Sequence, residues 1–284
     1  MIKIIEKEDI QIVSKYVWNV YQDENKRTTP PYKSFDQVED SLLRFLADEQ
    51  DEIIAVYKED ELKGIAMTGM DLKNKYFSIK GPYIDCSDDY MSIASEIMDY
   101  LELNYKGFKC DFGTTRANTN SQKFLISKGF ACTEDTVQMS IIPNQLIDLA
   151  LEHNIQLLTD ERKDEYRNFH DTHFHNYYWL ADGIYSVMDR WKVHVLIEQD
   201  RIVGSVFTMR QRENSGEVYG CEILEPYKNE QVMAELFHIS TKSWMDEGVN
   251  EIINFVPEGI YSTSASMVGY EGYDTYMCFS KEEI

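Results

Sequence analysis

The sequence lacks any apolar run that approaches the roughly 18 residues needed to span a membrane. Its first residues, Met1–Glu6, also lack the long apolar stretch and the small-residue cleavage site of a signal peptide. We therefore expect no membrane segment, and we expect the chain to be cytoplasmic.

Positive charge is scarce. Lys and Arg number 28 against 50 Asp and Glu, which gives a net charge of −22. Binding of phosphate backbones requires clustered Lys and Arg, so we expect neither nucleic acid nor an anionic membrane surface as a partner. Such acidity would favour a cationic substrate, although the simpler interpretation is that it keeps the protein soluble.

The pattern of metal ligands and thiols is also sparse. The cysteines are odd in number, scattered and without a CxxC pair, which predicts reduced thiols and neither a disulfide framework nor a zinc site (Cys86, Cys110, Cys132, Cys221 and Cys278). His170 and His173 have the spacing of two metal ligands on one helix, but no third ligand accompanies them. We expect no metal.

What the sequence does contain is an internal repeat. Its 284 residues are about twice the commonest domain length. The strand–turn–strand pattern of 54–66 recurs at 194–206, and the glycines match in the same order (Gly64 with Gly204, Gly129 with Gly269). The repeat predicts two copies of one domain, 1–142 and 155–284, joined by a linker at 143–154 that we expect to be a docked helix.

Each copy shows the same order of expected elements. In the first copy, apolar residues recur at helical spacing over 10–20, and Ser34 with Gln37 is a capping box that opens a second helix. A strand pair, a third strand, a core helix, a strand, a short helix and a last strand follow (52–70, 75–84, 93–101, 109–114, 119–128 and up to 142). The second copy repeats this order, which predicts an α/β (α+β) class with a mixed, mostly antiparallel sheet flanked by helices.

The segment Asn118–Phe130 has the pattern of a short helix that begins at Asn118 and ends in a Lys-Gly-Phe turn. The residue three positions after Asn118 is the small Ser121. This segment resembles motif B of the GNAT (GCN5-related N-acetyltransferase) superfamily, and the predicted element order resembles the GNAT fold over nearly the whole chain, twice. The resemblance implies that acetyl-CoA or another acyl-CoA is a cosubstrate. In the first copy, the residues that would bind it are Ile84, Asp85, Tyr90, Met91, Ser92, Ile93, Ala94, Asn118 and Ser121.

Both copies depart from the family's pyrophosphate motif, in which small residues let phosphates reach the backbone N–H groups of a helix N-terminus. The first copy has the small Ser92 and Ala94 but an acidic Asp89. The second keeps a basic Lys228, but Met233 would stand where a small residue is needed. We therefore expect the first copy to be the acyl-CoA binder.

The chemistry has weaker signals. Members of the family often have a Tyr that acts as the general acid, and at its position this sequence has Leu125 in one copy and Ala265 in the other. The catalytic residues are therefore unknown. Asp85 and Glu222 are weak candidates for proton transfer. Side chains placed by the resemblance at the acceptor cleft are Tyr32, Tyr177, Tyr178 and Trp179.

The resulting hypothesis is an acyl-CoA-dependent N-acyltransferase, acting on a small amine by direct transfer. The alternative is a GNAT-fold binding or regulatory module without turnover. A monomer with two pseudo-symmetric halves and a homodimer are both compatible with the sequence. It identifies neither the acceptor, nor the acyl chain length, nor the active copy.

Overall fold

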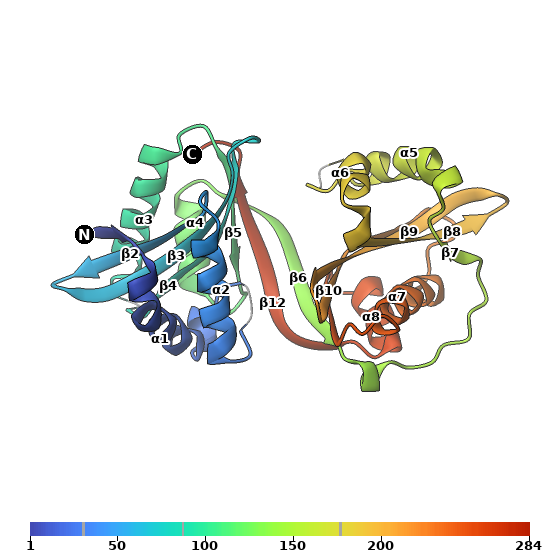
Figure 1. Ribbon diagram of the computed structural model, residues 1–284, viewed down its shortest axis with the longest axis horizontal. Coiled ribbons are helices and arrows are strands. Elements are labelled where there is room, and N and C mark those ends of the chain that lie inside the picture. Colours follow the sequence, from blue (N-terminus) through green and yellow to red (C-terminus); the bar gives the residue numbers. More distant parts are fainter. Residues whose placement is uncertain (30–31, 87, 176–177) are drawn as a thin grey trace. The chain divides into compact units, whose positions relative to one another are not determined.

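The structure is a computed structural model that describes residues 1–29, 32–86, 88–175 and 178–284. The chain forms two compact units (Figure 1). The first unit consists of Met1–Asp135 together with Thr275–Ile284, and the second consists of Thr136–Asp274. Among the described residues no helix is long and apolar enough to cross a membrane.

The first unit contains one mixed sheet in the strand order β1-β2-β3-β4-β5-β12. All of its described pairings are antiparallel except β4 with β5, which is parallel. Its strands are β1 (Ile2–Ile4), β2 (Glu52–Lys58), β3 (Glu61–Asp71), β4 (Tyr76–Ile84), β5 (Lys109–Thr114) and part of β12 (Glu271–Lys281). Its helices are α1 (Ile10–Tyr21), α2 (Phe35–Ala47), α3 (Tyr90–Asn104) and α4 (Thr119–Ser127).

Two apolar cores form on the two faces of this sheet. One contains the buried faces of α1 and α2, and the other contains those of α3 and α4. The expected cap at Ser34 is present, since its Oγ accepts a hydrogen bond from the Gln37 N–H at 3.3 Å and α2 begins at the next residue. The apolar stripe of α3 is buried as the helical spacing predicts, through Ile93, Ile97 and Leu101.

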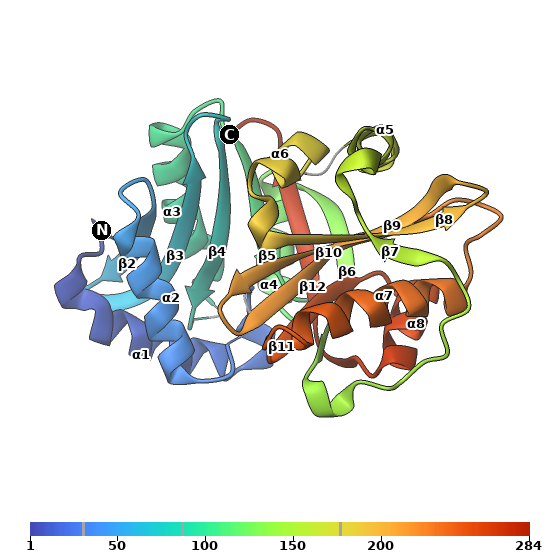
Figure 2. The ribbon, with the colours of Figure 1, turned by 45° about the vertical axis from the view of Figure 1, so that its right-hand side comes forward.

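The second unit repeats this arrangement in the strand order β6-β11-β10-β9-β8-β7. Helices α5 and α6 lie on one side of the sheet, and α7 and α8 lie on the other (Figure 2). The strands are part of β6 (Ala131–Ile141), β7 (Ile155–Leu157), β8 (Trp191–Glu198), β9 (Arg201–Arg212), β10 (Ser215–Ile223) and β11 (Glu251–Val256). The helices are α5 (Lys163–His173), α6 (Ala181–Ser186), α7 (Glu230–Met245) and α8 (Ile260–Val268).

The two units match in irregular details as well as in element order. The β2–β3 hairpin shifts register at Val56/Tyr57, and the β8–β9 hairpin shifts at Leu196/Ile197. Each hairpin turns through two consecutive non-glycine residues with positive φ, Glu59–Asp60 and Gln199–Asp200. Together with the mixed, mostly antiparallel sheets flanked by helices, these matches confirm the predicted fold class and the tandem repeat.

The last strand of each copy pairs with a sheet other than the one that the predicted boundaries at 142 and 155 imply. Met277–Lys281 of β12 pairs with β5 of the first unit. Val137–Ile141 of β6 pairs with β11 of the second unit. Each copy in the sequence therefore ends with a strand that completes the sheet of the other copy. The sequence repeat cannot reveal this exchange, because strands with similar alternation fit either sheet.

The linker is docked, as expected, but it is not helical. Apart from a short 3₁₀ turn at Pro143–Gln145, it is irregular up to β7. The Ile147 N–H donates to the Val268 carbonyl at 2.9 Å, and Leu146 and Leu149 pack against the core beneath α7 and α8. The apolar residues that suggested a helix are there because they cover this core.

Candidate functional site

In each unit the parallel strand pair separates before its longer member ends. β4 pairs with β5 from Tyr76/Lys109 to Lys80/Gly113 and then continues to Ile84. β10 pairs with β11 from Ser215/Glu251 to Val218/Asn254 and then continues to Ile223. Such a divergence leaves main-chain groups of the longer strand available to a ligand or another segment, and in both units a helix begins a few residues later.

In the first unit, the residues predicted to bind acyl-CoA divide into two groups. Met91 and Ser92 are exposed in the first turn of α3, and Asp85 is exposed just past β4. The remaining six are buried (Ile84, Tyr90, Ile93, Ala94, Asn118 and Ser121). The predicted role of Asn118 as a helix opener is visible, since its Oδ1 accepts the Ser121 N–H at 3.0 Å. Whether these residues bind a nucleotide stays a prediction.

A segment of the chain itself occupies the divergence of β4 and β5, a feature that we missed in the sequence. Thr28 forms an antiparallel bridge with Thr114, at the end of β5. The Arg27 carbonyl accepts hydrogen bonds from Asn118 Nδ2 at 3.1 Å and from Thr115 Oγ1 at 3.3 Å. Both Thr28 and Thr114 are buried. We call Lys26–Thr29 the insert segment.

Two further predicted residues lie beside this segment. Asp85 forms an ion pair with Lys26 at 2.7 Å. Tyr32 is buried rather than lining an open cleft: its hydroxyl lies 3.2 Å from Ser41 Oγ, and its ring contacts those of Tyr21 and Tyr83. The predicted acceptor residue Tyr32 is therefore packed inside the first unit.

The second unit places a cluster of charged and hydroxyl groups at the corresponding point. Lys228 lies two residues before α7, and its Nζ is 3.3 Å from Glu222 Oε1 and 3.0 Å from the Tyr261 hydroxyl. Burial would lower the pKa of Lys228, but Tyr261 and Glu222 outweigh it, so the pKa is raised. Burial also raises the pKa of Tyr261. Glu222, one of the two weak candidates, thus contacts Lys228, which in turn contacts Tyr261, whereas Asp85 forms an exposed ion pair. Tyr261 was missed because it occupies a different turn of its helix from Ala265.

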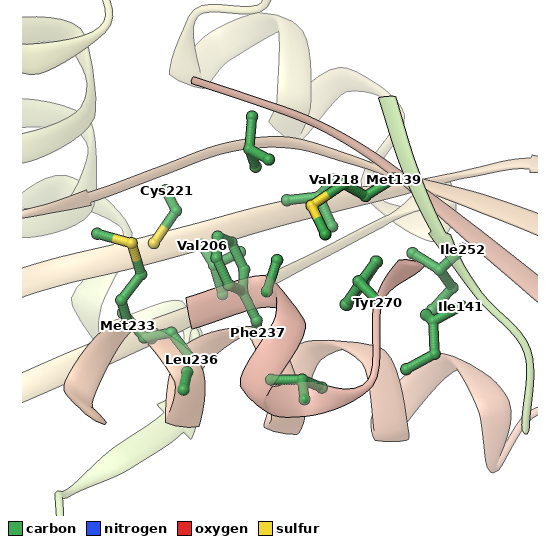
Figure 3. Close-up of a cluster of buried hydrophobic side chains, with 14 of the residues drawn as sticks. Met139, Ile141, Val206, Val218, Cys221, Met233, Leu236, Phe237, Ile252 and Tyr270 are labelled. Carbon is green, nitrogen blue, oxygen red and sulfur yellow. The ribbon is translucent and has the colours of Figure 1, made fainter. Parts of the chain in front are cut away.

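The expectation that Met233 would obstruct phosphate binding is wrong. The N-cap of α7 is Asn229, whose Oδ1 accepts the Val232 N–H at 3.0 Å, and the N-cap of α3 is Asp89. Counting from these caps, Met233 corresponds to Ile93, and both face the core. Figure 3 shows the Met233 side chain next to Cys221 among the buried apolar residues. The predicted alignment was one residue out of register, because the loop that precedes α7 is one residue longer.

The histidines of the second unit have structural partners. His170 is fully buried between the Tyr166 hydroxyl and the Trp179 carbonyl, each 2.9 Å from one ring nitrogen. Burial lowers its pKa, which keeps the imidazole neutral. Its Nε2–H then donates to the carbonyl, and Nδ1 accepts from the tyrosine. His173 is exposed, and no group of three or more potential metal ligands occurs in the described part of the chain.

The predicted aromatic acceptor residues of the second unit differ in exposure. Tyr178 is exposed, and its ring meets that of Trp179 edge to face at 5.2 Å. Trp179 in turn contacts the buried Trp191 at 5.3 Å. Tyr177 lies outside the described residues. An exposed aromatic edge thus continues into the core beneath α5 and α6.

Comparison with solved structures identifies the fold. A GCN5-related N-acetyltransferase from Sphaerobacter thermophilus is similar over 100% of this chain and 96% of its own, with a TM-score of 0.71 and 11% identity. One from Kribbella flavida is similar over 86% and 94%, with a TM-score of 0.58 and 12% identity. A tandem GNAT protein from the clavulanic acid biosynthesis pathway is similar over 99% and 98%, with a TM-score of 0.53 and 8% identity.

The sequence itself gives no such match. No protein-family model matches it, and no curated protein is significantly similar to it. At 8–12% identity the likeness to these structures is a likeness of fold.

Proposed function

Because the chain carries the GNAT fold twice, we propose that it transfers an acyl group from acyl-CoA directly to a small amine, with the reacting site in the second unit. The observation that carries this proposal is the Lys228–Glu222–Tyr261 cluster at the divergence of β10 and β11. The corresponding divergence in the first unit is filled by the insert segment. The acyl group is proposed to be acetyl, as the names of the similar structures indicate.

The second unit has groups that fit an anionic cosubstrate at this point. The Lys228 ammonium lies beside the first turn of α7, where backbone N–H groups and the helix dipole favour negative charge. The pyrophosphate of CoA would lie at this helix end. No bulky side chain obstructs the approach from the position of Met233, since that side chain faces the core.

The cluster also provides the groups that amine acylation needs. The thioester supplies an activated carbonyl carbon, at which a C–N bond forms as the C–S bond breaks. Glu222, a carboxylate at the divergence, would accept the proton that the amine loses. Lys228 donates a hydrogen bond to the Tyr261 oxygen, which leaves the Tyr261 O–H free to donate its proton to the departing sulfur. The ammonium would stabilise the phenolate that remains.

For the first unit, the alternative of a binding or regulatory module without turnover is favoured. Its divergence is occupied, and the carboxylates of Asp85 and Asp89 lie near the N-terminus of α3. Like charge at that helix end weakens pyrophosphate binding without blocking the approach.

The test is isothermal titration with acetyl-CoA, CoA and desulfo-CoA. Lys228→Ala should weaken binding about tenfold, because one charge-assisted contact contributes about 1.5 kcal/mol. Lys242→Ala is the matched control, since it removes the same charge from the other end of α7, where Lys242 pairs with Asp246. Tyr261→Phe should leave binding unchanged and reduce CoA release with a panel of amines by about 100-fold or more.

Equal losses in Lys228→Ala and Lys242→Ala would mean that net charge, rather than a site, governs binding. A wild-type protein that binds none of the three compounds would reject the proposed function.

A further inference from the structure

The insert segment Lys26–Thr29 takes the place of a ligand strand in the first unit. Thr28 lies against Thr114 as an antiparallel bridge partner. On the opposite side of the divergence, the Tyr83 hydroxyl donates to the Thr29 carbonyl at 3.5 Å. The segment thus contacts β4 and β5 at the point where they separate, as an added strand would.

The surroundings of the segment are shaped to hold it. Gly113 of β5 has no side chain, and a Cβ at that position would lie 1.8 Å from Thr29 Oγ1. Asn118 and Thr115 both donate to the Arg27 carbonyl. Lys26 is held by Asp85 at 2.7 Å, and the Arg27 guanidinium donates to the Tyr21 carbonyl at 3.1 Å and lies over its ring. Because consecutive residues of the segment all make such contacts, the segment is bound in a defined position and is not a loose surface loop.

The contact nevertheless leaves a polar group without a partner. The hydroxyl oxygen of Thr114 is buried and has no hydrogen-bond partner among the described residues. A buried hydroxyl without a partner costs free energy, so this contact is less stable than its depth would suggest. A segment that fills a site incompletely can be displaced from it.

We propose that the first unit contains a second, latent acyl-CoA site that the insert segment closes. Each chain then binds one acyl-CoA in the resting state, in the second unit, and a second molecule only when Lys26–Thr29 leaves the divergence of β4 and β5. The identity of the ligand rests on the proposed function; the closure of the first unit does not.

A clamp and a release variant test this inference. The clamp is the double variant Thr28→Cys/Thr114→Cys. Its two cysteines would be paired residues of an antiparallel bridge, and a disulfide can span the distance between the Cα atoms of such a pair. Oxidation should fix the segment in place, and acetyl-CoA should still bind with a stoichiometry of one and a Kd within about twofold of the wild type. Loss of binding on oxidation, with recovery on reduction, would place the resting site in the first unit and overturn the inference.

Gly113→Ala is the release variant, because its methyl group would lie 1.8 Å from Thr29 Oγ1 and 3.1 Å from Thr29 Cβ, so that Thr29 must shift. It should raise the stoichiometry from one to two. Gly216→Ala is the matched control: it adds the same methyl group to β10, where the nearest atom lies 3.5 Å away, and should leave the stoichiometry at one. A folded Gly113→Ala protein that still binds one molecule overturns the latent site.

Hydrogen exchange separates this inference from the proposed function. Amides of residues 26–29 should be protected in the wild type and in Gly216→Ala, and lose protection in Gly113→Ala. If they exchange in the wild type as fast as in an unstructured peptide, the segment does not close the site. Protection in a protein that binds no CoA in any variant would reject the proposed function and the latent acyl-CoA site together, while leaving the closure demonstrated.

Discussion

His194 shows how a single buried residue couples folding to pH. It lies on β8 with 4% of its surface exposed, and its Nδ1 has no hydrogen-bond partner in the described part of the chain. Burial, with a smaller contribution from the Lys192 charge, lowers its pKa from 6.5 to about 4. Between these two pH values the unfolded chain binds a proton that the folded protein does not. Stability therefore rises with pH through this range and is lost as the pH falls from 6.5 towards 4.

We predict that His194→Gln reduces this loss. Between about pH 8 and pH 4.5 the wild type should lose about 2 to 3 kcal/mol more unfolding free energy than the variant, measured by urea denaturation at each pH. His175→Gln is the control, because His175 is exposed. Its substitution should leave the pH dependence of the unfolding free energy the same as in the wild type. Parallel curves for the wild type and His194→Gln would contradict the prediction.

Single residues also show what the sequence could predict. The caps at Ser34 and Asn118 follow from local hydrogen-bonding chemistry, and both are present. The orientation of Met233 depends on where α7 begins, which one additional loop residue changes. The partners of Lys228 come from β10 and α8, and no local pattern brings them together.

At the scale of elements, the insert segment and the linker were the least predictable parts. The insert segment precedes the first hairpin and matches none of the elements expected from the sequence, yet Thr28 is buried against β5. The sequence contains one clue in Gly113, whose missing side chain makes room for Thr29, although a glycine near a strand end has many possible causes.

A buried carboxylate on α7 binds the C-terminal end of the linker. Glu235 accepts hydrogen bonds from the backbone N–H groups of Glu152 and His153, both at 3.1 Å, and His153 Nδ1 lies 3.1 Å from it. Burial acts to raise the pKa of Glu235, but hydrogen bonds from Gln231, His153 and the two backbone groups lower it on balance. The carboxylate is therefore charged at neutral pH and fixes the end of the linker.

Glu235→Ala should release this end. We expect a loss of about 3 kcal/mol of unfolding free energy, since two backbone donors lose a charged acceptor, together with new protease cleavage in 146–153. Glu230→Ala, which removes an exposed carboxylate from the same helix, should change neither property by a comparable amount. A Glu235→Ala protein as resistant to protease as the wild type would show that the apolar contacts hold the linker alone.

At the scale of the whole molecule, the repeat and the fold could be predicted because hairpins, helix stripes and glycines recur in order. The destination of β6 and β12 could not, because each strand suits either sheet. Their core residues make the exchange testable. Phe279 pairs with Phe112 and is buried in the first unit. Ile141 pairs with Ile252 and is buried in the second.

Phe279→Ala should destabilise the first unit by about 3 to 5 kcal/mol, and Ile141→Ala should destabilise the second by about 2 to 5 kcal/mol. Hydrogen exchange should accelerate over 109–128 in the former variant and over 216–256 in the latter. Each variant is the control for the other. The opposite assignment, with Phe279→Ala loosening β10 and β11, would mean that each copy keeps its own last strand.

The exchange of strands has a consequence for the order in which the protein is made. The second unit is one continuous stretch, Thr136–Asp274, whereas the first also needs Thr275–Ile284, which is synthesised after the whole of the second unit. Domains usually fold from the N-terminus as they are synthesised. Here the earlier half must wait with the β5 edge of its sheet uncovered, while the later half can already be complete. We expect protease added to stalled nascent chains to spare the second unit first, with the N-terminal half protected only once Thr275–Ile284 has emerged from the ribosome.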